Sequence, residues 1–265
     1  MPTVRQPAVA GQFYPADPRA LERAVQSHLD ALEGSGAGTA PAPTVLIVPH
    51  AGYEYSGPIA ASAFSRLTAS AIGGGGGRVV LIGPSHYAAF DGLALSGADV
   101  FATPLGPVAV DRGAEALLSR LPQVATLPAV HAPEHALEVE LPFLQRLLRT
   151  FELVPVLVGD AEPSLIAEAL DLLLRDEGAL LVVSSDLSHF LDYDSARRCD
   201  RATASRIEAR EAIASDDACG WVALNGLAAW LRDRGVEAPH LLDLRSSGDT
   251  GGPRASVVGY GAFAG

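Results

Sequence analysis

Lysine does not occur in this chain, because all 19 of its basic residues are arginine. Lysine contacts the phosphates in a P-loop, forms Schiff bases with carbonyl substrates and anchors pyridoxal phosphate. Its absence therefore excludes three large classes of enzyme. Positive charge is scarce in general, since the formal net charge is -12 at pH 7. Binding to nucleic acid needs dense basic side chains along the phosphates, so no nucleic-acid partner is expected.

Long apolar runs are also missing. No stretch approaches 18 consecutive apolar residues, and the first residues, MPTVRQPAVAGQFYP, lack the apolar core of a signal peptide. We therefore expect no membrane span, no secretion and a cytoplasmic location.

Cysteine is rare as well. Cys199 and Cys219 are expected to be thiols, because a reducing compartment does not favour a disulfide.

Several short apolar runs indicate a buried sheet. Four of them have the length and composition of strands that are covered on both faces, at residues 45–48, 79–82, 154–158 and 180–183. Less regular strands are expected at residues 93–96, 108–111, 241–245 and 256–263. Such runs are typical of parallel strands in the centre of an α/β domain.

Helical patterns alternate with these runs. They cover residues 58–67, 114–121, 136–149, 164–175, 196–214 and 221–233, and an earlier helix is expected after Pro18 with Asp17 as its N-cap. Residues 34–43 and the pentaglycine 73–77 are interpreted as connections, too short to separate two domains. The sequence therefore predicts a single α/β domain over residues 1–265, with a mostly parallel central sheet flanked by helices.

Three of the seven histidines follow predicted strands. His50 ends the stretch VLIVPH, His86 ends VVLIGPSH and His189 ends LLVVSSDLSH. Ligands of open α/β sheets bind outside the carboxyl ends of the strands, where loops from different strands converge. We therefore predict a metal or acid/base site at this edge, although one such histidine alone would more often hydrogen-bond within its own loop. Asp186 is a candidate for the carboxylate that orients His189.

Cys219 lies in the segment SDDACGWVALNGLAAWL. Asp216 or Asp217 is expected to cap a helix whose first turn contains this cysteine. A helix N-terminus lowers the pKa of a thiol and favours the thiolate, which binds metals. The alternative interpretation is a small buried apolar side chain.

The segment 131–141, HAPEHALEVEL, is rich in ionisable residues but is not the HExxH motif of zinc proteases. Pro133 argues against a shared helical face for His131 and His135. His135 and Glu138 are one turn apart, so they either lie beside the site or simply begin a helix. A serine hydrolase based on the serines before His189 is disfavoured, because no GxSxG elbow is present.

Ordered motifs span nearly the whole chain. They read RQPAVAGQFYPADPRAL, PHAGYEYSGPIAASAF, LIGPSHY, EHALEVELPFLQ, VVSSDLSHFLDY, ACGWVAL, and RSSGD with SVVGYGAF. Together they resemble the motifs of the Memo family, also called AmmeMemoRadiSam system protein B. The resemblance implies a fold similar to the class III, LigB-like extradiol dioxygenases, which use non-haem iron(II).

The resemblance also implies roles for individual residues. His50, His86 and Cys219 match the metal ligands of the family, and His189 matches its acid/base position. Non-haem iron oxygenases usually present two histidines and one carboxylate, whereas a thiolate shifts the preference toward copper(I), zinc or a more electron-rich iron centre. The resemblance to iron(II) dioxygenases makes iron(II) the expected cofactor, and the thiolate leaves copper and then zinc as alternatives.

Three functions follow as hypotheses. The first is a metal-dependent, dioxygenase-like oxidoreductase of unknown substrate, in which His189 transfers a proton and Asp186 orients it. The second is a non-catalytic protein that binds a metal or a peptide in the same pocket, and the third is a zinc hydrolase. The resemblance further implies a functional association with an AMMECR-like protein and a radical SAM protein. Two cysteines cannot supply a radical SAM cluster in this chain itself.

Overall fold

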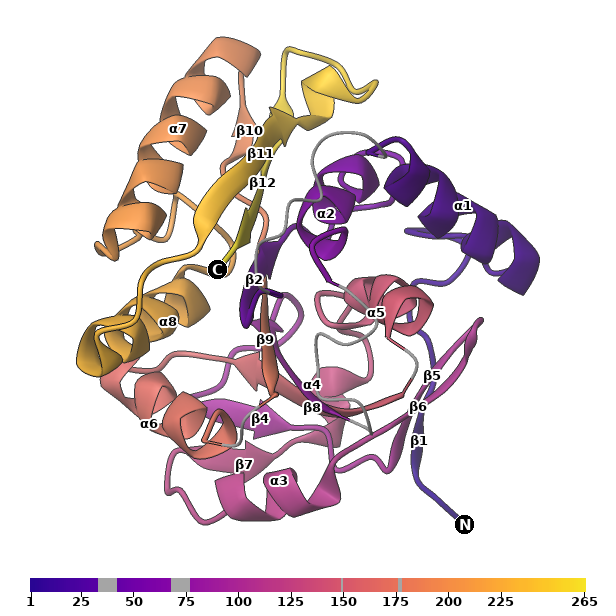
Figure 1. The fold of residues 1–265 in the computed structure, drawn as a ribbon, viewed down its shortest axis with the longest axis vertical. Coiled ribbons are helices and arrows are strands. Elements are labelled where there is room, and N and C mark those ends of the chain that lie inside the picture. Colours follow the sequence, from indigo (N-terminus) through magenta and orange to yellow (C-terminus); the bar gives the residue numbers. More distant parts are fainter. Residues whose placement is uncertain (33–41, 68–76, 149, 176–177) are drawn as a thin grey trace.

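The computed structural model describes residues 1–32, 42–67, 77–148, 150–175 and 178–265 of the chain. Within these residues, a nine-stranded sheet runs through the molecule and helices cover both of its faces (Figure 1). Its strand order is β10-β12-β2-β9-β3-β8-β4-β7, with β11 paired to β12. A separate three-stranded sheet has the order β1-β5-β6. The predicted single α/β domain with flanking helices is confirmed.

Four parallel strands form the centre of the large sheet. They are β2 (Val45–Val48), β9 (Leu180–Ser184), β3 (Gly77–Pro84) and β8 (Phe151–Val158). Neighbouring residues of a strand point to opposite faces, so Leu46 belongs to one hydrophobic core and Ile47 to the other. Because both faces are covered, these strands are continuous apolar runs, as predicted.

The outer strands make the sheet mixed. β12 (Val257–Ala264) pairs antiparallel with β2, and both β11 (His240–Ser246) and β10 (His189–Leu191) pair antiparallel with β12. On the other side, β4 (Leu93–Leu95) is antiparallel to β8, and β7 (Val124–Thr126) is parallel to β4. The parallel arrangement predicted for the sheet therefore holds in its centre.

Helices on the two faces enclose two hydrophobic cores. One face carries α1 (Pro18–Asp30), α2 (Gly57–Phe64) and α5 (Leu141–Leu147), and the other carries α3 (Arg112–Leu118), α6 (Pro163–Leu173), α7 (Tyr193–Ala209) and α8 (Trp221–Arg234). The short α4 (Pro128–His131) precedes the HAPEHALEVEL glutamates. The predicted N-cap is confirmed, because Asp17 Oδ1 accepts the backbone N–H of Ala20 at 2.8 Å. Among the described residues, no helix is long and apolar enough to cross a bilayer.

Strands β5, β7 and β10 and the short helix α4 were not predicted, and two further segments differ from the prediction. The sequence predicts one continuous helix over residues 136–149. The structure has a short 3₁₀ helix, Glu138–Glu140, followed by the separate helix α5. Pro142 has no backbone N–H and therefore cannot continue a helical hydrogen-bond ladder, so a new helix begins around it. The N-terminal segment, predicted as a loop, contributes β1 (Val4–Arg5), which pairs with β5 (Val100–Thr103). β6 (Gly106–Ala109) completes that sheet.

The glycine-rich connections fall mostly outside the described residues. Residues 34–41 and 73–76 are not described, whereas Gly77 begins β3. Cys199 and Cys219 are both free cysteines, as expected.

Candidate metal centre and its pocket

Three histidine side chains converge at the carboxyl ends of the central strands. His50 follows β2, His86 follows β3, and His135 precedes the 3₁₀ helix Glu138–Glu140. One ring nitrogen from each lies within 4.8 Å of the other two. The ring centroids are 5.1 Å apart for His50 and His86, 5.5 Å for His50 and His135, and 4.7 Å for His86 and His135. This spacing suits one shared metal ion.

The Nδ1 atom of each ring faces a polar group outside the cluster. His50 Nδ1 lies 2.7 Å from Ser184 Oγ, and His86 Nδ1 lies 2.9 Å from Glu134 Oε1. His135 Nδ1 is 3.3 Å from the same Glu134 oxygen, although this contact lacks hydrogen-bond geometry. The Nε2 atoms are therefore left for a common ligand. Outer contacts of this kind orient the histidines of metal sites.

The electrostatics favour neutral imidazole, which is the form that binds metals. Burial, reinforced by the neighbouring histidines, holds the pKa of His50 well below its ordinary value. Burial also lowers the pKa of His135 to about 4. Burial alone would raise the pKa of Glu134, but the hydrogen bond and charge of His86 outweigh it and hold that pKa below its ordinary value. The Glu134 carboxylate therefore lies behind the His86 ring and next to the neutral ring of His135.

Cys219 lies beside this cluster. Its Sγ is 3.3 Å from His50 Nε2 and accepts the backbone N–H of Asp186 at 3.2 Å. Burial, followed by the nearby Asp186 carboxylate, raises the pKa of the Cys219 thiol. A thiolate at this position therefore needs a compensating cation such as a metal ion.

The predicted helix position of Cys219 is wrong. The helix α8 begins at Trp221 with Gly220 as its N-cap, so Cys219 precedes the first turn. The Asp217 carboxylate pairs instead with Arg206 at 2.5 Å and accepts the backbone N–H of Ala214. Because the Asp217 carboxylate is bound within the preceding loop, it does not cap α8. The pKa of the Cys219 thiol is therefore set mainly by burial and not by the end of the helix.

His189 and Asp186 both line the site. Contrary to the prediction, the Asp186 carboxylate does not orient the His189 ring. His189 Nδ1 lies 2.8 Å from the carbonyl oxygen of Leu187, which therefore orients the ring. Asp186 Oδ1 accepts the backbone N–H of His50 at 2.8 Å. The Asp186 side chain turns toward the end of the neighbouring strand β2, so it supports the loop that carries His50. Burial raises the pKa of Asp186 to about 7 and lowers the pKa of His189.

A cavity of about 460 Å³ opens onto the three histidines. Its volume is in the range of small-molecule sites. The ring centroid of Phe13 lies 4.7 Å from that of His135. The lining comes from the N-terminal segment, the loops after β2, β3 and β9, and the C-terminal segment, and it includes Phe13, Tyr55, His189, Pro253, Val258 and Tyr260. The cavity therefore has mainly aromatic and aliphatic walls, and its polar part includes the three histidines.

Comparison with known proteins identifies the family of this chain. The sequence model of the family described as "Memo-like protein" matches residues 5–264. The chain belongs to the Memo-like family. It is 34% identical to the MEMO1 family protein MTH_45 of Methanothermobacter thermautotrophicus, and the match covers 97% of this chain and 98% of that protein. A MEMO1 family protein of Aquifex aeolicus is 33% identical over 97% of both chains, and one of Thermotoga neapolitana is 34% identical over 97% and 98%.

Two residues of the centre in this Memo-like chain were not predicted from the sequence. His135 completes the histidine cluster, and Glu134 supports it by accepting the backbone N–H groups of His135 and Ala136 at 2.9 Å each. Their signal is the EH pair in HAPEHALEVEL, which the prediction left open. His131 lies elsewhere, with Nε2 2.9 Å from the carbonyl oxygen of Ala94.

Glu138 and His135 face different partners in the Memo-like fold. The Glu138 carboxylate is fully buried, pairs with Arg5 and accepts the Tyr14 hydroxyl. It also accepts the backbone N–H groups of Ala8 and Val9 at 2.7 and 3.0 Å. Glu138 therefore anchors the N-terminal segment that brings Phe13 to the pocket.

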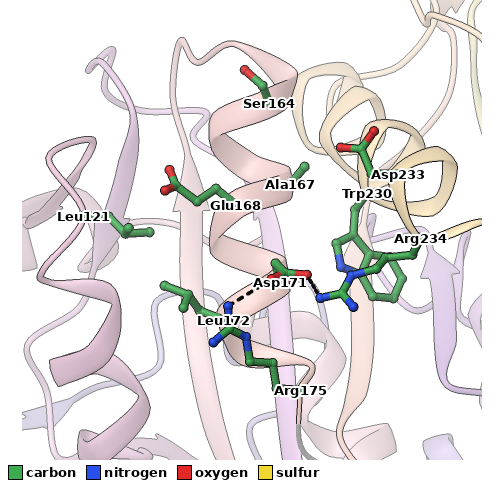
Figure 2. Close-up of a pocket in the computed structure, with 10 residues that line it drawn as sticks. All are labelled: Leu121, Ser164, Ala167, Glu168, Asp171, Leu172, Arg175, Trp230, Asp233 and Arg234. Atoms are coloured by element: carbon green, nitrogen blue, oxygen red, sulfur yellow. Dashed lines mark hydrogen bonds and ion pairs between the residues drawn. The ribbon is translucent and has the colours of Figure 1, made fainter.

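A second cavity of the Memo-like chain lies between α6 and α8, with a volume of about 340 Å³ (Figure 2). Asp171 lies between Arg175 and Arg234 and pairs with both, so the charged groups at the centre of this cavity already have partners within the protein. The predicted site residues do not line this cavity. The histidine cavity is therefore the stronger candidate for a functional site.

Proposed function

We propose that this Memo-like protein is a metal-dependent oxidoreductase with a dioxygenase-like site. His50 and His86 would hold the ion, with His135 and Cys219 as the remaining donors. The observation that carries this proposal is the convergence of three imidazoles whose Nδ1 atoms face Ser184 and Glu134. Such an arrangement leaves three ring nitrogens available to a single ion.

The donor set fits some metals better than others. Imidazole suits iron, copper, zinc and nickel, whereas a thiolate favours copper(I), zinc and iron. Iron(II) is the proposed cofactor, copper is the alternative and zinc the third choice. A bound iron or copper ion would supply the electron-transfer and oxygen chemistry that side chains cannot.

The residues around the cluster have separate proposed roles. His189 lies in the same cavity as His50 and His86, and its lowered pKa leaves it neutral at pH 7, ready to accept a proton from a bound substrate. Asp186 holds the His50 loop through the backbone. The aromatic and aliphatic walls would bind the apolar body of an organic substrate and exclude water from it.

A non-catalytic binding protein is the second candidate function. Two exposed aromatic residues support it, because Phe190 directly follows His189 and Tyr87 directly follows His86. The Tyr87 ring centroid is 5.9 Å from that of His135. Exposed aromatic side chains beside an apolar pocket are suited to contact a peptide or protein ligand.

Metal content is the first test. Protein purified without oxygen or chelator would be analysed by mass spectrometry as wild type, His50→Ala, His135→Ala and Cys219→Ala. His240→Ala is the matched control, because this exposed histidine lies on β11. The proposal predicts near-stoichiometric iron or copper in the wild type and the control, with loss in His50→Ala. No metal in the wild type after anaerobic reconstitution would contradict it.

The same variants distinguish the two donor sets. Loss of metal in His135→Ala but not in Cys219→Ala would assign the centre to three histidines, and the reverse result would assign it to two histidines and the thiolate. Oxygen consumption by the metal-loaded wild type with phenolic and thiol substrates then distinguishes the oxidoreductase from the non-catalytic binding protein. Metal binding without oxygen consumption would favour the binding protein.

A further inference from the structure

Ser184 lies between His50 and the buried carboxyl group of Glu140, which is not a member of the histidine cluster. The Ser184 Oγ atom lies 2.7 Å from His50 Nδ1, 2.7 Å from the carbonyl oxygen of Ala136 and 2.9 Å from Glu140 Oε1. Ser184 and Glu140 are fully inaccessible to solvent, and His50 is 1% exposed. Each of the three distances is short enough for a hydrogen bond.

Counting hydrogen atoms decides the direction of each bond. A serine hydroxyl has one hydrogen and two lone pairs. The Ala136 carbonyl can only accept, so at 2.7 Å the serine hydrogen must lie on that contact. Ser184 therefore accepts from both other partners. His50 must carry its hydrogen on Nδ1, and Glu140 must be a neutral carboxylic acid whose O–H points at Ser184.

The surroundings of Glu140 agree with a neutral acid. Among the described residues, no hydrogen-bond partner reaches its Oε2 atom, and no ion pair is formed by this side chain. Burial, together with the charge of Asp186, holds the pKa of Glu140 well above its ordinary value. An ionised carboxylate at this place would be a buried charge without compensation.

We propose that Ser184 and Glu140 are positioning residues that fix His50 as the Nδ1–H tautomer, with Glu140 serving as a neutral hydrogen-bond donor. This tautomer leaves the lone pair of His50 Nε2 directed at Cys219 Sγ, 3.3 Å away, and at the histidine cluster. In the metal-free protein the Cys219 thiol donates to that nitrogen. The consequence for metal affinity rests on the proposed function, but the tautomer does not.

The tautomer is measured directly in metal-free protein. Nitrogen NMR of protein labelled with ¹⁵N-histidine distinguishes a protonated ring nitrogen from a bare one, and the His50 signals are assigned by their absence from His50→Gln. The expected result is a hydrogen on Nδ1 and a bare Nε2. A hydrogen on Nε2 of His50 in the wild type would overturn the inference.

Infrared spectroscopy tests Glu140 separately. The difference spectrum between wild type and Glu140→Gln at mildly alkaline pH should contain the carbonyl stretch of a protonated carboxylic acid. Glutamine keeps an N–H donor toward Ser184, so the His50 signals should be the same in this variant. A difference spectrum with the bands of an ionised carboxylate would overturn the neutral-donor role.

Ser184→Ala removes the acceptor of the His50 hydrogen. We expect the His50 signals to shift toward a mixture of tautomers and anaerobic iron(II) affinity to fall about 10- to 100-fold, as with other outer contacts of metal ligands. Ser96→Ala, which deletes another buried serine hydroxyl next to Glu115, is the matched control and should change neither quantity. Unchanged His50 signals in Ser184→Ala would contradict the positioning role. If the wild type binds no metal, the proposed function fails, and the NMR and infrared results still decide this inference.

Discussion

Glu134 holds His86 at two points. Its Oε1 atom lies 2.9 Å from His86 Nδ1, while its Oε2 atom accepts the backbone N–H of the same histidine at 2.5 Å. The Oε1 atom also accepts the backbone N–H of His135. One buried carboxylate, 48 residues from His86 in the sequence, therefore positions two of the three converging rings.

Replacing this carboxylate should weaken the metal centre. In Glu134→Gln the amide cannot accept all the N–H groups that the carboxylate accepts, so both rings lose orientation. We expect the metal dissociation constant to rise about 10- to 100-fold, measured by competition with a chromophoric chelator. Glu152→Gln on the exposed side of β8 is the matched control. Equal affinity in the two variants would exclude a supporting role for Glu134.

His189 should separate turnover from metal binding. The side chain lines the cavity but is not part of the three-histidine group, so His189→Gln is expected to keep the metal. Loss of a positioned acid/base group typically lowers the rate about 10²- to 10⁴-fold. Oxygen uptake at saturating substrate, normalised to metal content, measures this effect. A variant that loses its metal would instead place His189 among the ligands.

The sequence predicts the central sheet well, for a physical reason. Strands buried on both faces must be continuous apolar runs, so the runs that became β2, β3, β8 and β9 are recognisable without tertiary information. His50 and His86 directly follow two of these strands, and the parallel topology brings them together. The motif resemblance led to the correct family and fold.

The remaining parts of the site depend on contacts that a sequence does not display. His135 reaches the cluster from a loop, and Pro133 obscures the local pattern that would place it. The role of Glu140 depends on Ser184, which is 44 residues away. Asp186 was expected to orient the nearby His189 because of their spacing, but the end of the adjacent strand offers it the backbone of His50.

The N-terminal anchor should contribute strongly to stability. Arg5 and Glu138 form an ion pair with almost no solvent exposure of either side chain. Arg5→Ala leaves the Glu138 carboxylate buried without its cation, and such changes cost about 3–5 kcal/mol. The loss would be measured as a lower midpoint of urea unfolding with an unchanged slope. The exposed Arg19→Ala is the control, and equal midpoints for the two variants would exclude the proposed anchoring.

Asp200 should make stability depend on pH. Its carboxyl group is 2% exposed and accepts the backbone N–H of Ser188 at 3.0 Å, and burial raises its pKa from 3.8 to about 6. A raised carboxyl pKa means that the folded state binds the proton more tightly than the unfolded state does. Above about pH 6 the ionised group therefore lowers the free energy of unfolding by its full amount. This loss of stability disappears as the pH falls toward about 4.

Asp200→Asn tests this dependence, because asparagine stays neutral and its Oδ1 still accepts the Ser188 N–H. A shift from 3.8 to about 6 corresponds to about 3 kcal/mol, so the variant should be more stable than the wild type by up to that amount near pH 8. The difference should shrink steadily between about pH 6 and pH 4. Urea unfolding of both proteins across this range measures it. A difference that does not change with pH would show that the variant alters packing against Gly259, which the carboxylate contacts, rather than removing a buried charge.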